Sequence, residues 1–447
     1  MVRHGQSTYN VEQRVQGHCD ESILTEAGRT GALQVGEALS GLQFDAIYTS
    51  PLKRARATAD LIVSKLPAHS SNGSKAEVVD LLKEISLPPW EGMRFQEIQA
   101  AFPAQYQLWR DRPQELCFQI NGSDGPTDFF PIPSLYEQAS QFWQMALPGN
   151  QGKTLLVVAH SAINRALIST AIGLEPERFI SLYQSNCGIS ILNFANGWGS
   201  LAQLESLNLT AHLGEPLPKG RRGDRGARIL LVRHGETEWN RQQKFQGQID
   251  VPLNETGRAQ GQQAAEFLKS VPLDQAFTSP LLRPKETAEL ILKSHPTISL
   301  QLIDELQEIS HGEWEGKLEA EIEQAYPGDL QRWQQAPETV QMPAGENLQQ
   351  VWERAIAAWQ IIIDSAARLK PESTVLVVAH DAINKAILCH VAGLGPEHFW
   401  TFKQGNGAVS VIAYPHSSKR KPPVMQAVNI TTHLAGGILD KTAAGAL

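Results

Sequence analysis

The chain has few cysteines and no long apolar run, and each shortage excludes a class of protein. Its 447 residues include four cysteines, which lie far apart and form no Cys-x-x-Cys pair. This pattern favours a reducing compartment and indicates neither a disulfide framework nor a thiolate zinc site. No apolar run approaches the ~20 residues that a membrane helix needs, and no signal peptide precedes Arg3. We therefore expect a cytoplasmic protein with no membrane partner, unless a targeting segment has been removed.

Basic residues are also in short supply. The chain has 39 basic and 47 acidic residues, which gives a net charge of -8. Proteins that coat nucleic acid by neutralising its phosphates are basic, so no nucleic-acid partner is expected. The apolar content of 42% and the charged content of 19% are typical of globular domains. An anionic ligand must therefore meet a local basic pocket.

The sequence contains an internal repeat. The N-terminal segment MVRHGQSTYN returns as LVRHGETEWN at 231–240, and later segments return in the same order, including TSPLKRARATA as TSPLLRPKETA and LLVVAHSAINRALI as VLVVAHDAINKAIL. A tandem duplication explains this order. We predict domains at 1–214 and 228–434, a linker rich in Pro, Gly and Arg at 215–227, and a tail at 435–447.

Short apolar runs in both copies end in a histidine or in Arg-His. They are Leu155–Ala159, Ile229–Val232 and Val375–Ala379. Such runs are typical of strands buried on both faces of a parallel sheet, and helical segments at 162–171 and 382–391 follow two of them. The expected fold class is α/β, with two tandem three-layer α/β/α domains, each a mostly parallel sheet with helices on both faces. Because ligands bind at the carboxyl ends of such strands, two histidines per copy should meet at one edge.

Two histidines and two arginines per copy are the candidate functional residues. They are His4, His160, Arg3 and Arg54 in the first copy, and His234, His380, Arg233 and Arg283 in the second. Such groups repel one another unless an anion lies between them, and arginine forks match phosphate. A neutral histidine can act as the nucleophile, and a general acid must then protonate the leaving oxygen. Glu84 and Glu308 are the candidates for this acid, and Glu91, Glu305 and Glu315 are alternatives.

Four motifs, RHGxxxxN, SPLxRxxxTA, LxEIxxxxWEG and VVAH, occur in this order in both halves. Together they resemble the histidine phosphatase family, also called phosphoglycerate mutase-like, over nearly the whole chain. The resemblance implies a reaction without metal or cofactor in which His4 and His234 become phosphohistidines. It implies that Glu84 and Glu308 act as acid and then as base. It also implies that the phosphoryl group is held by the arginines, His160 and His380, with Asn10, Gln16, Asn240 and Gln246 as further polar residues of the pocket.

The family contains phosphatases and mutases. Mutases similar to this family carry a longer stretch between the acid and the last histidine. Here that stretch spans 76 residues, from 84 to 160, and 72 residues, from 308 to 380, which favours a phosphatase of small phosphorylated metabolites. A phosphoglycerate mutase, or a half that binds phosphate without turnover, stays open as an alternative. Oligomeric state stays open too.

The halves differ where the substrate should lie. The residue after the last histidine, usually glycine in the family, is Ser161 in the first half and Asp381 in the second. The first half has an insertion at 117–130, and the second has a PAGEN segment containing Glu346. The first half is similar to a tandem-domain chloroplast phosphatase of a sugar-acid phosphate. We expect Asp381 and Glu346 to place negative charge near the second pocket and to disfavour carboxylated substrates there.

The segments that precede the two RHG motifs also differ in length. Five residues, Arg228 to Val232, precede Arg233, but only Met1 and Val2 precede Arg3. A buried strand cut to two residues loses ladder hydrogen bonds and aliphatic burial. We therefore expect that the natural chain begins upstream or that the first half is the less stable one.

Overall fold

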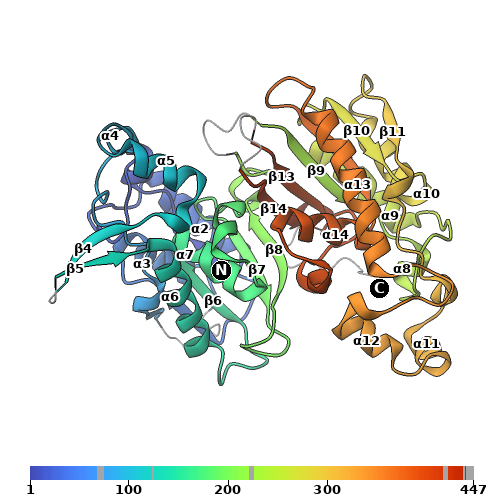
Figure 1. Ribbon diagram of the computed structural model, residues 1–447, viewed down its shortest axis with the longest axis horizontal. Helices are drawn as coiled ribbons and strands as arrows, with labels where there is room; N and C mark the ends of the chain where they lie inside the picture. Colours follow the sequence, from blue (N-terminus) through green and yellow to red (C-terminus); the bar gives the residue numbers. More distant parts are fainter. Residues whose placement is uncertain (68–74, 123–124, 221–225, 416–420, 436–437, 439–447) are drawn as a thin grey trace. The chain divides into compact units, whose positions relative to one another are not determined.

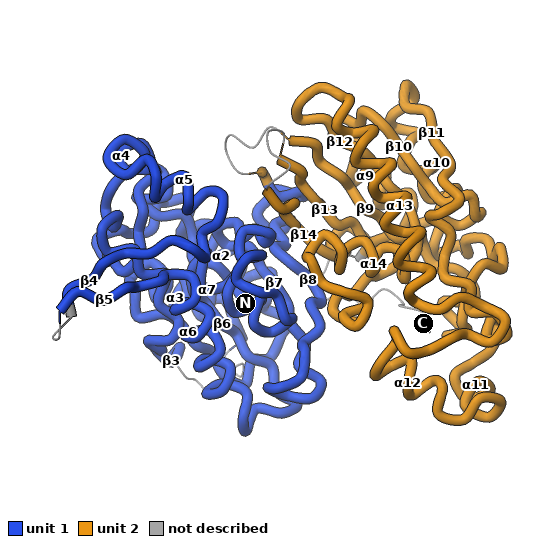
Figure 2. The backbone as a smooth tube through the Cα atoms, viewed as in Figure 1, with its two compact units in different colours: residues 1–218 blue, residues 219–447 orange. Residues whose placement is uncertain are grey.

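The computed structural model describes residues 1–67, 75–122, 125–220, 226–415, 421–435 and 438. The chain divides into two compact units, Met1–Pro218 and Lys219–Leu447 (Figure 2). Residues 221–225 of the predicted linker, and residues 436, 437 and 439–447 of the predicted tail, lie outside the described residues. The exact domain limits at 214, 228 and 434 therefore stay a prediction.

The first unit contains a mixed sheet. In sheet order its strands are β3 (Glu77–Val78), β2 (Ala46–Thr49), β6 (Leu155–Ala159), β1 (Val2–Arg3), β7 (Ile189–Asn193) and β8 (Gln203–Leu209). Strands β3, β2, β6 and β1 run parallel, whereas β7 and β8 are antiparallel. The insertion at 117–130 forms a separate antiparallel hairpin of β4 (Phe118–Gly122) and β5 (Gly125–Phe129).

The second unit repeats this topology without the hairpin. In sheet order its strands are β11 (Leu300–Leu302), β10 (Gln275–Thr278), β12 (Thr374–Ala379), β9 (Arg228–Arg233), β13 (Val409–Ala413) and β14 (Val424–Ile430). The apolar runs singled out in the sequence are β6, β9 and β12, and every residue of β12 is buried. The prediction of buried parallel strands that lead to histidines is confirmed.

Two pairs of helices pack in each unit (Figure 1). In the first, α2 (Glu26–Ala38) pairs with α3 (Lys53–Val63), and α6 (Pro131–Ala146) pairs with α7 (Ser161–Ile172). In the second, α9 (Glu255–Leu268) pairs with α10 (Leu282–Leu292), and α13 (Leu348–Ala366) pairs with α14 (Asp381–Ala392). The shorter helices are α1 (Thr8–Glu12), α4 (Phe95–Ala101), α5 (Pro103–Asp111), α8 (Glu238–Arg241), α11 (Glu319–Ala325), α12 (Asp329–Gln335) and α15 (Thr432–Ala435). The expected α/β/α class is confirmed.

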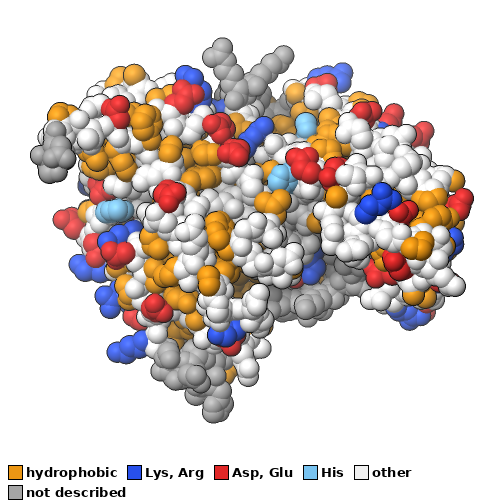
Figure 3. Space-filling view, turned by 60° about the horizontal axis from the view of Figure 1, so that its bottom comes forward, with side chains coloured by type: hydrophobic (Ala, Val, Ile, Leu, Met, Phe, Trp, Pro, Cys, Tyr) orange, Lys and Arg blue, Asp and Glu red, His pale blue; other side chains and the backbone are white. Residues whose placement is uncertain are grey.

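The long helices are amphipathic, and α13 shows why they form where they do. The side chain of Asn347 accepts a hydrogen bond from the Gln350 N–H and so caps the first turn. Apolar residues then recur at helical spacing, and Val351, Ala355 and Ile362 are buried. Within the described residues, no helix is long and apolar enough to cross a membrane. On the face shown in Figure 3, Lys and Arg are interspersed with Asp and Glu.

The strand before each RHG motif differs in length between the units. Strand β9 pairs with β12 at six positions, but β1 pairs with β6 only at Val2↔Val158 and Arg3↔Ala159. The amino group of Met1 donates to the Ser190 carbonyl at 2.8 Å. Burial lowers the pKa of this amine to about 5.

The loop that follows this strand lies directly against the next long helix. A Cβ on Gly235 would lie 2.3 Å from the Gly257 carbonyl oxygen, and a Cβ on Gly257 would lie 2.0 Å from the Glu236 oxygen. Gly5 and Gly28 make the same contact in the first unit. Only two glycines allow the backbones to approach this closely, so the glycine of the RHG motif sets the position of the histidine beside it.

Candidate active site

His4 and His234 follow β1 and β9 at the carboxyl edge of each sheet. Their backbone N–H groups donate to Ala159 and Ala379, at 2.9 and 3.0 Å. Each Nδ1 lies 2.7 Å from the carbonyl oxygen of the next glycine. Because a carbonyl only accepts, Nδ1 carries the proton and Nε2 keeps its lone pair. In both histidines the unprotonated ring nitrogen is therefore Nε2.

Both of these imidazoles are neutral at pH 7. Burial, and then Arg54 and Arg3, lower the pKa of His4 well below its ordinary value. Burial, and then Arg283 and Arg233, do the same to the pKa of His234. Protonation would add a cation to a buried group that already faces two guanidinium groups. Each nucleophile therefore keeps its lone pair without a separate base.

The second histidine of each unit lies beside the first. The ring centroids of His4 and His160 are 5.1 Å apart, and those of His234 and His380 are 5.2 Å apart. Nε2 of His380 lies 3.0 Å from the hydroxyl of Ser279, which itself accepts the Leu281 N–H at 3.4 Å. We infer that the hydroxyl donates its proton to Nε2, which leaves the proton of His380 on Nδ1. That Nδ1 is buried and has no hydrogen-bond partner, and the same is true of His160.

The arginines of the SPLxR motif are fixed by loop carbonyls. Arg283 donates from Nη2 to Gly247 at 2.8 Å and from Nη1 to Ile249 at 3.3 Å. Its Nε donates to Nε2 of His234 at 3.2 Å, which agrees with an unprotonated Nε2. Burial lowers the pKa of Arg283 to about 10, so it stays charged at pH 7. Arg54 is held similarly, and its Nε is buried without a partner.

The arginine before each nucleophile completes the basic group. Arg3 donates from Nη1 to the Gln184 carbonyl at 2.7 Å, and Arg233 donates to Gln404 at 2.6 Å. The Nε of each is buried and has no hydrogen-bond partner among the described residues. Buried donors in native proteins are normally satisfied, so these N–H groups indicate an anionic ligand. Among the described residues, no group of three or more His, Cys, Asp or Glu could hold a metal ion.

The two candidate acids lie at the start of the helix that follows the second histidine. Oε1 of Glu84 accepts from the Ala162 and Ile163 N–H groups of α7 at 3.0 and 3.1 Å. Oε2 of Glu308 accepts from the Asp381 N–H of α14 at 3.1 Å. Burial and the neighbouring Asp381 raise the pKa of Glu308. The geometry thus favours Glu84 and Glu308 as acids.

Two alternative acids, Glu91 and Glu315, bond to N–H groups of loops and not to the first turn of α7 or α14. Glu315 accepts N–H groups of Gln248, Ile249 and His311, and Glu91 accepts that of Leu87. Their carboxylates therefore stabilise the backbone of the loops that contain these N–H groups. The third alternative, Glu305, is exposed.

The polar residues expected in the pocket hold the segments 4–7 and 234–237, which follow the strand and contain His4 or His234. We call each of these segments the nucleophile loop. Oδ1 of Asn240 accepts from Thr237 and from Nδ2 of Asn406, and Asn406 also donates to the His234 carbonyl at 3.2 Å. Gln246 accepts from the Thr237 hydroxyl at 2.7 Å and has a buried Nε2 without a partner. Asn10 and Gln16 make the same contacts with Ser7. Among these four polar residues, the amide nitrogen of Gln246 is the one buried donor without a hydrogen-bond partner in the described part of the chain.

Residues outside the predicted set also contribute. Ser50 and Ser279 orient the second histidine, and Asn186 and Asn406 support the nucleophile loop. Both kinds of residue recur at matching positions in the repeated TSPL and QSNCG/QGNGA segments, and that recurrence was the available signal.

The segments that contain the candidate acids, residues 81–84 and 305–308, are held by different side chains in the two units. We call each of these segments the acid loop. Arg354 donates to the carbonyls of Glu305, Gln307 and Glu308 and pairs with both carboxylate oxygens of Glu346, at 2.7 and 2.8 Å. Glu346 was expected to add negative charge to the second pocket, and the structure shows that Arg354 pairs with it, so part of its charge is balanced. In the first unit the amide of Gln138 donates to the Leu81 and Lys83 carbonyls at 2.9 Å.

Comparisons with known proteins agree with the repeated motifs. The histidine phosphatase superfamily (branch 1) matches residues 1–206 and 229–424. The 2-carboxy-D-arabinitol-1-phosphatase of Triticum aestivum is 30% identical over 445 residues, covering 97% of this chain and 86% of the relative. Phosphoserine phosphatase 1 of Hydrogenobacter thermophilus is 34% identical over 209 residues, covering 46% of this chain and 94% of the relative.

A solved structure of a mycobacterial glucosyl-3-phosphoglycerate phosphatase has 26% identity and a TM-score of 0.39, and covers 42% of this chain and 89% of its own. The two matched segments lie in different compact units. The chain belongs to the histidine phosphatase superfamily, with one matched segment in each unit.

Proposed function

We propose that both units hydrolyse small phosphate monoesters, such as sugar or sugar-acid phosphates, through a phosphohistidine on Nε2 of His4 and His234. Family membership and the full-length phosphatase relative make the chain a phosphoric monoester hydrolase. One observation carries the mechanism. In each unit a neutral imidazole with an unprotonated Nε2 lies beside buried arginine and histidine nitrogens that have no hydrogen-bond partner among the described residues.

In the first step Nε2 attacks phosphorus, and the bond between phosphorus and the ester oxygen breaks. Glu84 or Glu308, in its protonated form, gives a proton to the leaving oxygen. The arginines and the Nδ1–H of His160 or His380 bind the phosphoryl oxygens, where negative charge develops. The products of this step are the free alcohol and a phosphohistidine.

In the second step water attacks the phosphohistidine. The carboxylate left by the first step takes a proton from this water, and the bond between phosphorus and Nε2 breaks. Inorganic phosphate leaves, the histidine returns to its neutral form, and the acid is again protonated. No metal or organic cofactor is needed for this balance, and none is proposed.

The mutase alternative is less well supported. A phosphoglycerate mutase of Gloeobacter violaceus is 31% identical but aligns with 44% of this chain, whereas the phosphatase from Triticum aestivum aligns with 97%. A mutase would require bisphosphoglycerate for sustained turnover, and a phosphatase would not. A half that binds without turnover is disfavoured because each unit carries the whole set of histidines, arginines and acid.

The test is to trap the intermediate. Rapid quenching of the full chain with labelled aryl phosphate should give an acid-labile, base-stable adduct, and a double variant, His4→Ala with His234→Ala, should lose both adduct and turnover. A matched control, His295→Ala, changes a histidine outside both sites and should keep them. Unchanged turnover in the double variant would show that the mechanism is wrong.

A further inference from the structure

Helix α14 begins with a buried carboxylate, whereas its equivalent α7 begins with a hydroxyl. Asp381 comes directly after His380, and only 1% of its surface is exposed. One carboxylate oxygen lies 3.3 Å from Nη1 of Arg233, and the other lies 2.6 Å from Nζ of Lys385. The position equivalent to Asp381 in the first unit is Ser161.

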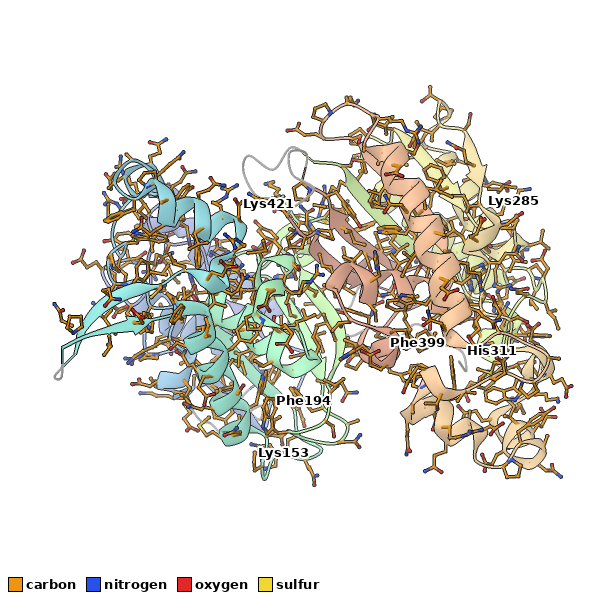
Figure 4. All side chains as sticks on the ribbon, viewed as in Figure 1. Lys153, Phe194, Lys285, His311, Phe399 and Lys421 are labelled. Carbon is orange, nitrogen blue, oxygen red and sulfur yellow. The ribbon has the colours of Figure 1, made fainter. Side chains whose placement is uncertain are left out.

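Aromatic rings fix the cation beside this carboxylate. The ammonium of Lys385 lies 4.4 Å from the ring of Trp400 and 5.1 Å from that of Phe399, which is labelled in Figure 4. Lys385 is itself buried, so the carboxylate of Asp381 is fixed between two buried cations. Ion pairs on both sides fix the position of this carboxylate.

The first unit has cations at the equivalent positions, and Ser161 stands where the second unit has Asp381. Arg3 takes the place of Arg233, and Arg165 takes the place of Lys385, with its guanidinium 4.0 Å from the Phe179 ring. The only change of charge at these three positions is therefore the loss of one negative charge at Ser161. Arg3 and Arg233 are also proposed phosphate ligands, so this difference lies within reach of the substrate.

We propose that Asp381 is a specificity-determining residue that fills, with a carboxylate of the protein, the place where the first site accepts a second anionic group of its substrate. This inference rests on the proposed function. The second site then takes phosphate monoesters without a carboxylate close to the ester. The first site takes carboxylated sugar phosphates, the class that the name of the Triticum aestivum relative specifies.

Electrostatics sets the size of the effect. A substrate carboxylate beside Asp381 would meet a like charge in buried surroundings, and would find Arg233 and Lys385 already paired with Asp381. In such a medium this repulsion is expected to lower kcat/KM roughly a hundredfold. Ser161 carries no charge and can donate a hydrogen bond to the same group.

The experiment uses the full chain with one site silenced. In a His4→Ala background, the ratio of kcat/KM for 3-phosphoglycerate to that for glycerol 3-phosphate is compared among Asp381, Asp381→Ser and Asp381→Asn. We expect both substitutions to raise the ratio by roughly a hundredfold, because each removes the charge and Asn keeps the shape. In a His234→Ala background, Ser161→Asp should lower the same ratio by a similar factor.

The outcomes separate the two proposals. If neither background hydrolyses an aryl phosphate, the proposed function fails. If both do, and the ratio stays within a few-fold in every variant, the specificity proposal is overturned. Should Asp381→Ser fail to fold, as judged by circular dichroism, Asp381→Asn and the reciprocal Ser161→Asp variant still decide the question.

Discussion

The two imidazoles of each unit carry their protons on the same ring atom for different reasons. In His234 a backbone carbonyl accepts from Nδ1, and this leaves Nε2 to attack. In His380 the hydroxyl of Ser279 donates to Nε2, and this leaves Nδ1–H to bind an anion. In the proposed mechanism one histidine is thus prepared as the nucleophile and the other as a hydrogen-bond donor, by neighbours that bear no charge.

Removing the serine hydroxyl should weaken binding of the transition state. In Ser279→Ala, His380 is free to take the other tautomer, so kcat/KM at the second site should fall about tenfold to a hundredfold. The free energy of unfolding should fall by about 1 kcal/mol for one lost hydrogen bond. The assay is hydrolysis of aryl phosphate in a His4→Ala background.

A conservative variant serves as the control for this positioning role. Ser279→Thr keeps the hydroxyl and should recover much of the activity, and the pH profile of Ser279→Ala should change as well as its height. Equal losses in Ser279→Thr and Ser279→Ala, with unchanged profiles, would mean that the serine has only a packing role.

The pH profile of the second site follows from two shifted groups. The nucleophile must be neutral, and the lowered pKa of His234 means that kcat/KM should not fall on the acid side until well below pH 6.5. The acid must be protonated, and the raised pKa of Glu308 moves the alkaline limb above the ordinary value of 4.5. Because Asp381 contributes to that rise, Asp381→Asn should move the alkaline limb to lower pH. Profiles of kcat/KM with His4 silenced test both limbs.

The histidine shifts also affect stability. A folded pKa below the unfolded value favours the neutral form, so the contribution of the four site histidines is complete above about pH 6.5 and is lost as the pH falls below it. Thermal unfolding of the unliganded chain between pH 7 and pH 5 should therefore show falling melting temperatures. A flat curve would contradict these shifts.

Sequence reasoning worked best for residues whose chemistry does not depend on orientation. Histidine and arginine at the end of a strand indicate a site for an anion, and this inference does not require the orientation of their side chains to be known. The roles of Ser279 and Asn406 depend on which atom of a neighbour they face, and only coordinates show that. The ion pair of Glu346 with Arg354 was not predicted, because the sequence does not show that the side chain of Arg354, within α13, turns back to the segment before the helix.

At the scale of elements, the close contact between the nucleophile loop and α9 leads us to expect that a glycine-to-alanine substitution in this helix destabilises the protein, which is the opposite of what helix propensity predicts. Replacing glycine by alanine inside a helix ordinarily stabilises it by up to about 1 kcal/mol. Gly257→Ala should instead destabilise the second unit by about 1–3 kcal/mol, because its Cβ would meet the Glu236 oxygen at 2.0 Å. Activity of the second site should fall with it, since the loop carries His234.

Another glycine of the same helix provides the matched control. A Cβ on Gly261 would meet only the side chain of Leu290, which can move. Gly261→Ala should therefore change stability and activity much less, as measured by denaturant unfolding and by aryl phosphate hydrolysis. Similar effects of both substitutions would show that the loop contact does not position the histidine.

Elements with a strong apolar signal were predictable, and others were not. Strands β6, β9 and β12 each contain an apolar run of four or five residues that is largely buried, so the pattern alone identifies them. Strand β3 is two exposed residues, and β5 is Gly-Pro-Thr-Asp-Phe, which has little β propensity. Such strands form because a neighbouring backbone offers hydrogen bonds, and that neighbour is set by the tertiary fold.

At the scale of the whole molecule, each unit contains its own complete set of histidines, arginines and acid. We therefore expect turnover to be additive. The activities of His4→Ala and His234→Ala on one aryl phosphate should sum to that of the parent chain, within error of the kinetics. A sum well below the parent value would show that one unit assists the other.

The duplicated fold also implies unequal local opening. The acid loop of the second unit is held by the charged fork of Arg354, whereas that of the first is held by the neutral amide of Gln138. Charged hydrogen bonds are roughly twice as strong as neutral ones. Backbone amides near Glu84 should thus exchange with deuterium sooner than those near Glu308, and a protease would find the first acid loop more readily than the second.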